Sequence, residues 1–154
     1  MNKFEGTWKY INGDTEFKIV LVKKLVVNAN DGGYIYDLLI GEYLYKENNV
    51  IIVNTLADIN NTSIRGYQHN IGGTLIMHNL NNPRCPQCDF SERRVKLIID
   101  KPNDMNASGY LTLRYLNING VQKLEAILEN ASIMGSEPPA KLDMPDGNYI
   151  FIKE

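Results

Sequence analysis

Residues 109–129 read GYLTLRYLNINGVQKLEAILE, and this stretch indicates the fold class. Apolar side chains such as Leu111 and Leu113 alternate with polar ones before Asn119-Gly120, and the alternation resumes after it at Leu124. A period of two places alternate side chains on opposite faces of a β-strand. Asn-Gly tolerates positive φ at both central positions of a type I′ turn, and a second such pair, Asn12-Gly13, predicts another tight hairpin turn near the start of the chain. The stretch therefore predicts an antiparallel hairpin with one buried face.

Similar patterns recur along the chain, separated by turns rich in Asn, Asp and Gly, and no long segment keeps a helical period with caps. One buried and one wet face per strand is typical of antiparallel sheets. A meander of about nine strands avoids free edges most simply by closing. We expect an all-β fold, a single antiparallel meander β-barrel of about eight to ten strands, with a β-sandwich as the alternative. The expected strands are 7–11, 15–27, 34–46, 50–56, 71–79, 92–100, 109–117, 121–129 and 147–153.

Length and composition limit what the chain does. Its 154 residues and 17.5 kDa predict one domain over residues 1–154. A net charge of −2 argues against a nucleic-acid partner, which needs a basic surface. Arg94 and Lys96 alternate with apolar residues, so we expect them on a solvent face without an anionic partner. No run of about 18 apolar residues occurs, so no transmembrane segment is expected.

The triplet Gly6-Thr7-Trp8 resembles the motif that begins the first strand of calycins, the superfamily of lipocalins and fatty-acid-binding proteins. The resemblance implies an up-and-down barrel that encloses a small apolar ligand. In it, Gly6 and Trp8 would be structural residues, with the Trp8 ring plugging the closed end.

Three segments together, GTWKY (6–10), NGDTEF (12–17) and LIGEYLYK (39–46), resemble an uncharacterised bacterial family of domains of unknown function. Members usually carry a secretion leader. The resemblance therefore implies a protein exported to the periplasm, the outer membrane or the medium, with its leader removed. Residues 1–6 show no apolar leader segment, so a cytoplasmic location is the alternative. The resemblance implies no catalytic residue, and we expect no cofactor.

The sharpest local motif is Cys85-Pro86-Gln87-Cys88, which holds both cysteines of the chain. A thioredoxin-like site needs a strand before the motif and a helix start after it, and neither is predicted here. A zinc site needs four ligands, and the two histidines lie upstream at no standard spacing. We expect a disulfide between Cys85 and Cys88, or two unreactive thiols, and no metal site. Zinc binding and redox catalysis remain alternatives.

His69 and His78 are the only histidines, and so the only side chains whose ordinary pKa lies near neutral pH. One functional hypothesis is an enzyme that uses His69, His78 or the cysteine pair. A nucleophilic triad would also need a serine and an acid, and the chain lacks a Gly-x-Ser-x-Gly elbow. We therefore expect surface or hydrogen-bonded histidines and no catalytic residues.

Glu42 follows Gly41 in a tyrosine-rich predicted strand. If the alternation continues through Gly41, Glu42 shares a face with Ile40 and points into the interior. If Gly41 marks a bulge, Glu42 reaches water, while Tyr43 and Tyr45 point inward. The second arrangement is favoured because it keeps the carboxylate hydrated.

The leading hypothesis for function is non-enzymatic binding of a small apolar or amphipathic molecule inside the barrel. A fully packed core is the alternative explanation for the same inward side chains. The second hypothesis is a cell-envelope module that binds a protein partner through loops or a strand edge, which a barrel filled by its own side chains would favour. The candidate ligand-binding residues are Phe17, Leu21, Leu38, Ile40, Leu97, Leu113, Tyr115 and Leu128.

Overall fold

A computed structural model describes residues 1–28, 34–131 and 140–154. Within these ranges, no helix is long and apolar enough to cross a membrane. Three short 3-10 helices are described: η1 (Asn2–Phe4), η3 (Leu56–Asn60) and η4 (Gly66–Gln68). The strands are β1 (Gly6–Asn12), β2 (Thr15–Asn28), β3 (Tyr34–Glu47), β4 (Val50–Asn54), β5 (Ile71–Met77), β6 (Arg94–Lys101), β7 (Asp104–Ile118), β8 (Val121–Ala131) and β9 (Gly147–Lys153).

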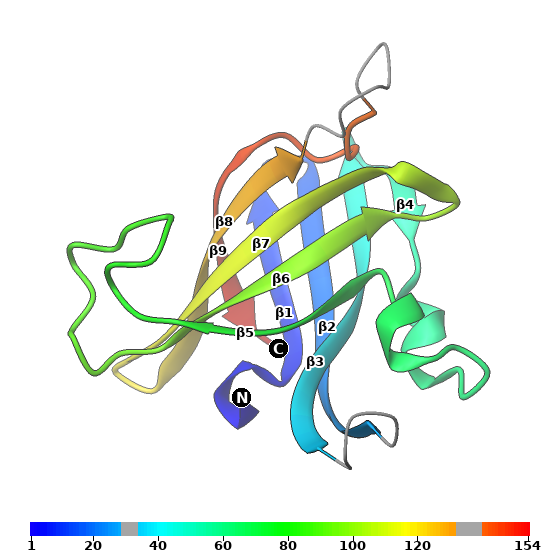
Figure 1. Cartoon of the computed structure of the whole chain (residues 1–154). Coiled ribbons are helices and arrows are strands. Elements are labelled where there is room, and N and C mark those ends of the chain that lie inside the picture. Colours follow the sequence, from blue (N-terminus) through cyan, green and yellow to red (C-terminus); the bar gives the residue numbers. More distant parts are fainter. Residues whose placement is uncertain (29–33, 132–139) are drawn as a thin grey trace.

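Eight of these strands close into an antiparallel barrel (Figure 1). The order runs β2-β1-β9-β8-β7-β6-β5-β3, and the β2–β3 pair completes the circle. β4 is an extra strand that pairs with the end of β3. The predicted all-β barrel is confirmed, and the sandwich alternative is wrong.

One end of the barrel is organised around the buried ring of Trp8. Its indole Nε1 donates a hydrogen bond to the carbonyl of Phe4, 2.9 Å away, in the short helix η1 that lies at this end (Figure 1). The ammonium of Lys153 lies 5.2 Å from the centre of the Trp8 ring, within cation–π range. Gly6 has a φ of +126°, and a Cβ there would lie 2.9 Å from the Lys153 side chain. Glycine at this position therefore permits the backbone turn and leaves room for the lysine.

The barrel interior is filled by its own side chains. The Phe17 ring packs edge-on against Tyr45 and Tyr149, with ring centres 6.0 and 5.4 Å apart. Edge-to-face contacts at such distances are favourable and leave little empty space. Six of the candidate ligand-binding residues belong to this packing: Phe17, Leu21, Leu97, Leu113 and Leu128 are buried in the core, and Tyr115 packs against it.

β3 keeps its alternation through Gly41. Gly41 pairs with Leu21, and Tyr43 pairs with Ile19, and both partners belong to the core. The bulge favoured at Gly41 is therefore wrong. Glycine is needed because a Cβ there would lie 2.6 Å from both the Leu21 side chain and the carbonyl oxygen of Val20.

Leu38, Ile40 and Glu42 consequently lie on the outer face of β3, so the expectation that Leu38 and Ile40 point inside is wrong. The expectation that Glu42 reaches water is also wrong, because its side chain is 0% exposed. Tyr43 and Tyr45 do point inward. The alternating pattern predicts only two environments for a side chain, the core or water. Glu42 occupies a third environment, an outer face of the barrel that another segment covers.

The two expected Asn-Gly turns differ in the structure. Asn119 and Gly120 form the two-residue turn between β7 and β8, both with positive φ, which confirms that prediction. Between β1 and β2 the turn is one residue later than expected. Asn12 is still paired, and the two turn residues are Gly13, with a φ of +56°, and Asp14.

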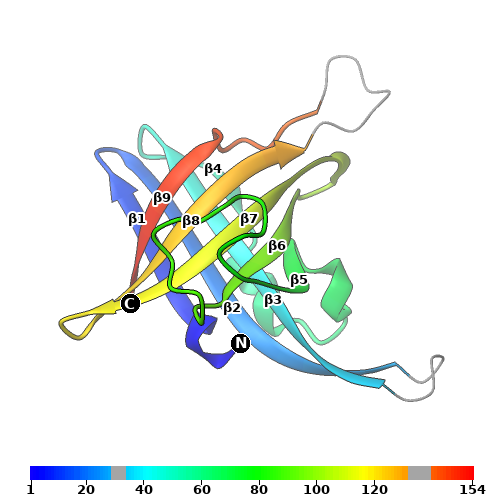
Figure 2. The same cartoon turned by 60° about the vertical axis from the view of Figure 1, so that its left-hand side comes forward.

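Two irregular segments cover the outside of the barrel. Residues 55–70, which contain η3 and η4, lie against β3 and are called the helical cover below. Residues 78–93, between β5 and β6, contain both cysteines and are called the disulfide loop. Figure 1 places the two segments on opposite sides, and Figure 2 shows the disulfide loop crossing in front of β7 and β8.

Candidate functional site

The helical cover buries the carboxylate of Glu42 and satisfies it. Its Oε1 lies 2.8 Å from Nδ1 of His69. Its Oε2 accepts a hydrogen bond of 2.7 Å from the Asn70 side-chain amide, and the Asn70 backbone N–H donates to Oε1 at 3.4 Å. A buried charge is tolerated when hydrogen bonds replace its water. A carboxylate beside Nδ1 favours the proton on that nitrogen and fixes the orientation of the ring.

The described residues do not complete an enzyme-like constellation around His69. No hydroxyl or thiol among them lies within hydrogen-bond distance of its ring. His78 belongs to the disulfide loop on the other side of the barrel, where its Nδ1 accepts a hydrogen bond of 3.2 Å from the Leu80 backbone N–H. The structure therefore separates His69 from both His78 and the cysteines.

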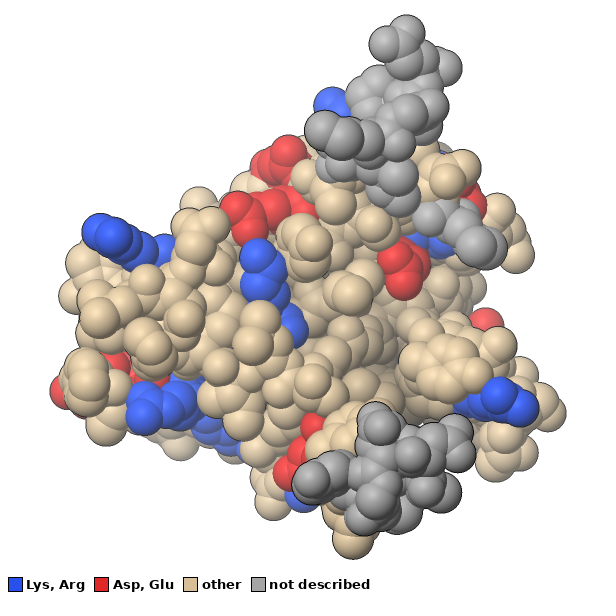
Figure 3. Space-filling model, viewed as in Figure 1, with Lys and Arg blue, Asp and Glu red and all other residues tan. Residues whose placement is uncertain are grey.

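An apolar depression, called the outer groove below, lies beside the helical cover over β3, β5 and β6. Its volume is about 680 Å³. Tyr36, Leu38 and Ile98 contribute apolar side chains, while Arg65 and His69 add polar groups from the cover. Figure 3 shows this side of the molecule as largely uncharged and hollowed next to the cover.

The outer groove exists because Gly72 carries no side chain. Gly72 pairs with Ile98 on the outer face, and the nearest atom to a Cβ built there is the Leu39 carbonyl oxygen at 4.0 Å. The next residue, Gly73, faces inward, where a Cβ would lie 3.1 Å from the Leu97 backbone. The first glycine therefore opens the groove, and the second allows close packing of two strands.

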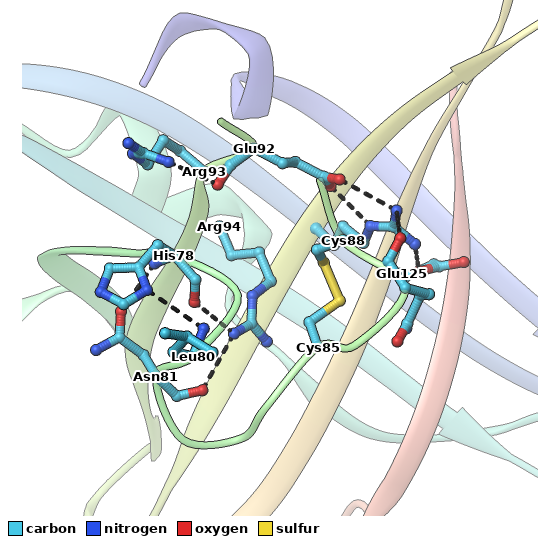
Figure 4. The surroundings of a disulfide bond; sticks show 11 residues. His78, Leu80, Asn81, Cys85, Cys88, Glu92, Arg93, Arg94 and Glu125 are labelled. Carbon is cyan, nitrogen blue, oxygen red and sulfur yellow. Dashed lines mark hydrogen bonds and ion pairs between the residues drawn. A yellow bond between two sulfur atoms is a disulfide. The ribbon is translucent and has the colours of Figure 1, made fainter. Parts of the chain in front are cut away.

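On the opposite side, Cys85 and Cys88 are joined by a disulfide with their Cα atoms 5.3 Å apart (Figure 4). Arg114 of β7 ties the loop to the barrel: its Nε lies 2.7 Å from Glu92, and its Nη1 lies 2.9 Å from Glu125 of β8. The hydrogen bond from Arg114 lowers the pKa of Glu92 below its ordinary value. Across residues 1–28, 34–131 and 140–154, no group of three His, Cys, Asp or Glu side chains is placed to hold a metal ion.

Between the disulfide loop and the outer face of β7–β9 lies a cavity of about 330 Å³, called the arginine pocket below. Arg94 lines it and is only 3% exposed, so its expected place on a solvent face is wrong. One terminal nitrogen, Nη2, donates to the carbonyls of His78 and Asn81 at 3.0 and 3.2 Å (Figure 4). Its Nε is buried and has no partner among the described residues. Burial lowers the pKa of this guanidinium, and the nearby Arg114 cation adds to the effect.

Comparison with known proteins assigns the chain to a family. A family model described as a family of unknown function, DUF6705, matches residues 1–154. The chain belongs to DUF6705. No curated protein and no solved structure shows significant similarity to it. The resemblance of residues 6–10, 12–17 and 39–46 to a family of domains of unknown function is therefore confirmed.

Sequence reasoning missed the two most distinctive surface features of this DUF6705 barrel. The alternation of the strand predicts that Arg94 is an ordinary solvated charge, because it does not show that a distant loop folds over the outer face. Gly72 gives no specific signal, because a glycine pair in a strand has no single meaning. The sequence contains one indication that Arg94 is covered, because the loop that covers it carries the two cysteines of the chain.

Proposed function

We propose that this DUF6705 barrel is a non-enzymatic binding protein, and that a small amphipathic molecule binds in the outer groove instead of in the barrel interior. The observation that carries the proposal is the groove itself. Its volume of about 680 Å³ lies within the range of roughly 300–1,000 Å³ typical of small-molecule sites, and its lining is mainly apolar with a few polar groups. The packed interior favours a site on the outside.

The lining suggests the chemistry of the ligand. An apolar body would pack on Tyr36, Leu38 and Ile98, because rings and branched aliphatic side chains bury apolar surface at low entropic cost. An anionic or hydrogen-bonding head group would face Arg65, whose Nη1 donates a hydrogen bond of 3.0 Å to the Tyr67 hydroxyl at the rim. Guanidinium groups pair well with carboxylates and sulfonates.

The test uses 8-anilinonaphthalene-1-sulfonate, which combines an aromatic body with one anionic group. Its fluorescence is titrated with the wild type and with Gly72→Leu. The leucine side chain would occupy the groove, so we expect affinity to fall at least about tenfold, or about 1.4 kcal/mol. The melting temperature should change little, because a Cβ at Gly72 meets no atom closer than 4.0 Å.

Val121→Leu is the matched control. It adds apolar bulk at an exposed position away from the groove, at the start of β8, and it should leave dye binding unchanged. Equal dye affinity in wild type and Gly72→Leu, with both folded, would contradict the proposal.

We further propose export as the location of this function. What supports it is the Cys85–Cys88 disulfide, since such bonds persist mainly in oxidising compartments. The test is thiol labelling of the protein taken directly from its native cells. We expect a maleimide to label Cys85 and Cys88 only after reduction, whereas immediate labelling of both would favour the cytoplasm.

Binding to a protein is a second candidate function, favoured by the free edge of β4. Among the described residues, β4 pairs only with β3, and Val50, Ile51 and Ile52 are 60%, 55% and 45% exposed. An open apolar edge is suited to pairing with another strand, including the same strand of a second copy. Sedimentation equilibrium should then show self-association that Ile51→Lys removes. A wild type that stays monomeric would contradict self-pairing.

A further inference from the structure

Two residues that line the arginine pocket each carry a buried polar atom without a partner among the described residues. Arg94 is 3% exposed and Thr112 is 2% exposed, and both line the cavity. Within the part of the chain that the structure describes, the Nε of Arg94 and the Oγ1 of Thr112 have no hydrogen-bond partner. Most buried polar atoms in folded proteins are paired, so an exception calls for an explanation. Two exceptions at one cavity indicate that their partner is a molecule from outside the chain.

The charge around the pocket indicates the kind of partner. Arg94 makes no ion pair with any acidic side chain of the described residues, and its protein partners are the two carbonyls named above. Glu125 also lines the pocket, and its carboxylate lies 2.9 Å from Arg114, which pairs with Glu92 at 2.7 Å as well. Arg84 adds a further positive side chain from the disulfide loop. A guanidinium donates hydrogen bonds and accepts none, so the missing partner is an acceptor.

We propose that the arginine pocket binds an oxyanion, the carboxylate, phosphate or sulfate group of a small molecule. The anion would accept hydrogen bonds from Arg94 and from the Thr112 hydroxyl, with Arg84 facing it from the loop. Charge-assisted hydrogen bonds of this kind are about twice as strong as neutral ones. The cavity of about 330 Å³ has room for more than the anionic group alone. This site is separate from the outer groove, which lies beside the helical cover. Figure 1 shows that the helical cover and the disulfide loop lie on opposite sides of the barrel.

The disulfide loop forms the wall of the pocket that faces away from the barrel. Cys85 and Gln87 line the cavity, and the Gln87 carbonyl accepts a hydrogen bond of 3.4 Å from Arg114. The short disulfide fixes the loop next to these two residues (Figure 4). The loop thereby holds its polar groups over the outer face of the sheet, as a binding site requires.

The test titrates the protein with sodium phosphate, sodium sulfate and sodium acetate at constant ionic strength, with chloride as the reference. The readout is the arginine Nε–Hε region of the ¹H–¹⁵N NMR spectrum. We expect the Arg94 signal to shift and saturate with at least one of the three anions. Thr112→Val should weaken that binding about tenfold, the effect of losing one hydrogen bond to a charged group.

Two further variants keep the test specific. Thr112→Ser retains the hydroxyl and should retain most of the affinity, whereas loss of binding in Ser and Val alike would overturn the role given to that hydroxyl. Gly72→Leu, at the outer groove, should leave anion binding unchanged. The proposal is wrong if none of the three anions gives a saturating shift of the Arg94 signal in the folded wild type. It is also wrong if Thr112→Val binds as tightly as the wild type.

Discussion

Glu42 and Arg94 each carry a charge on the outer face of the barrel, and each is buried beneath an irregular segment. The helical cover supplies Glu42 with His69 and both donors of Asn70, so the carboxylate is fully satisfied. The disulfide loop supplies Arg94 with two carbonyls, while its Nε has no partner in the described part of the chain. Glu42 therefore holds the helical cover in place, whereas Arg94 keeps a donor that a ligand can use. Burial alone does not distinguish the two roles, and the completeness of hydrogen bonding does.

The largest expected effect is at Glu42. Glu42→Ala removes the acceptor of three hydrogen bonds and leaves the buried His69 ring and the half-buried Asn70 without it. Breaking a buried pair in this way costs about 3–5 kcal/mol of unfolding free energy, to be measured by urea denaturation. Glu154→Ala, at a half-exposed ion pair, is the control and should cost less than about 1 kcal/mol. A loss below about 1 kcal/mol for Glu42→Ala as well would remove the structural role assigned to Glu42.

Arg94→Met should have a smaller effect. The two carbonyls lose their donor, but a buried charge with no acidic partner among the described residues disappears at the same time, so we expect a loss of about 1–3 kcal/mol. Arg93→Met is the matched control, because Arg93 is the exposed neighbour and its replacement should stay within about 0.5 kcal/mol of the wild type. A loss as large as that of Glu42→Ala would show that Arg94 is a structural charge too, and the contrast between the two sites would fail.

At low pH, protonation of Glu92 should weaken its bond to Arg114 and so destabilise the disulfide loop. Its folded pKa lies below the ordinary value of 4.5 because Arg114 donates a hydrogen bond to it. The stabilisation is therefore fully present above that ordinary value, and it is lost as the pH falls through the lowered folded pKa. Hydrogen–deuterium exchange of residues 78–93 at pH 6, compared between wild type and Glu92→Gln, should show faster exchange in the variant. At a pH below the folded pKa the two proteins should exchange alike, and a difference that persists there would contradict this assignment.

The smallest expected effect is that of Thr112→Val on the anion-free protein. The hydroxyl has no partner within the described chain, so its replacement by a methyl group should leave the melting temperature unchanged or raise it slightly. Differential scanning calorimetry in chloride buffer measures this. A clear destabilisation would mean that the Thr112 hydroxyl has a structural partner, and Arg94 alone would then remain as the unsatisfied group of the pocket.

The barrel was predictable because its strands bury one face, and alternation reports this directly. Leu111, Leu113 and Leu128 lie inside as that pattern implies. The outer face was not predictable in the same way. Leu38, Ile40 and Arg94 face outward under segments distant in sequence, and a period of two carries no information about such coverage.

The positions of the hairpin turns were also predictable only in part. Asn119-Gly120 forms the predicted turn, because Ile118 and Val121 pair directly across it. At Asn12-Gly13 the strand pairing extends one residue further, and only Gly13 keeps the positive φ that its sequence suggested. Turn chemistry thus located both hairpins, while cross-strand packing decided the register of one.

Gly72 and Gly73 are adjacent glycines of β5, yet natural selection is expected to act on them differently. At Gly73 an added Cβ meets the neighbouring strand, so selection for folding alone should keep glycine there across DUF6705. At Gly72 the fold leaves space for a side chain, so selection for folding alone should allow other residues at that position. Glycine kept at both positions among distant relatives would therefore record selection on the outer groove, separate from selection on stability.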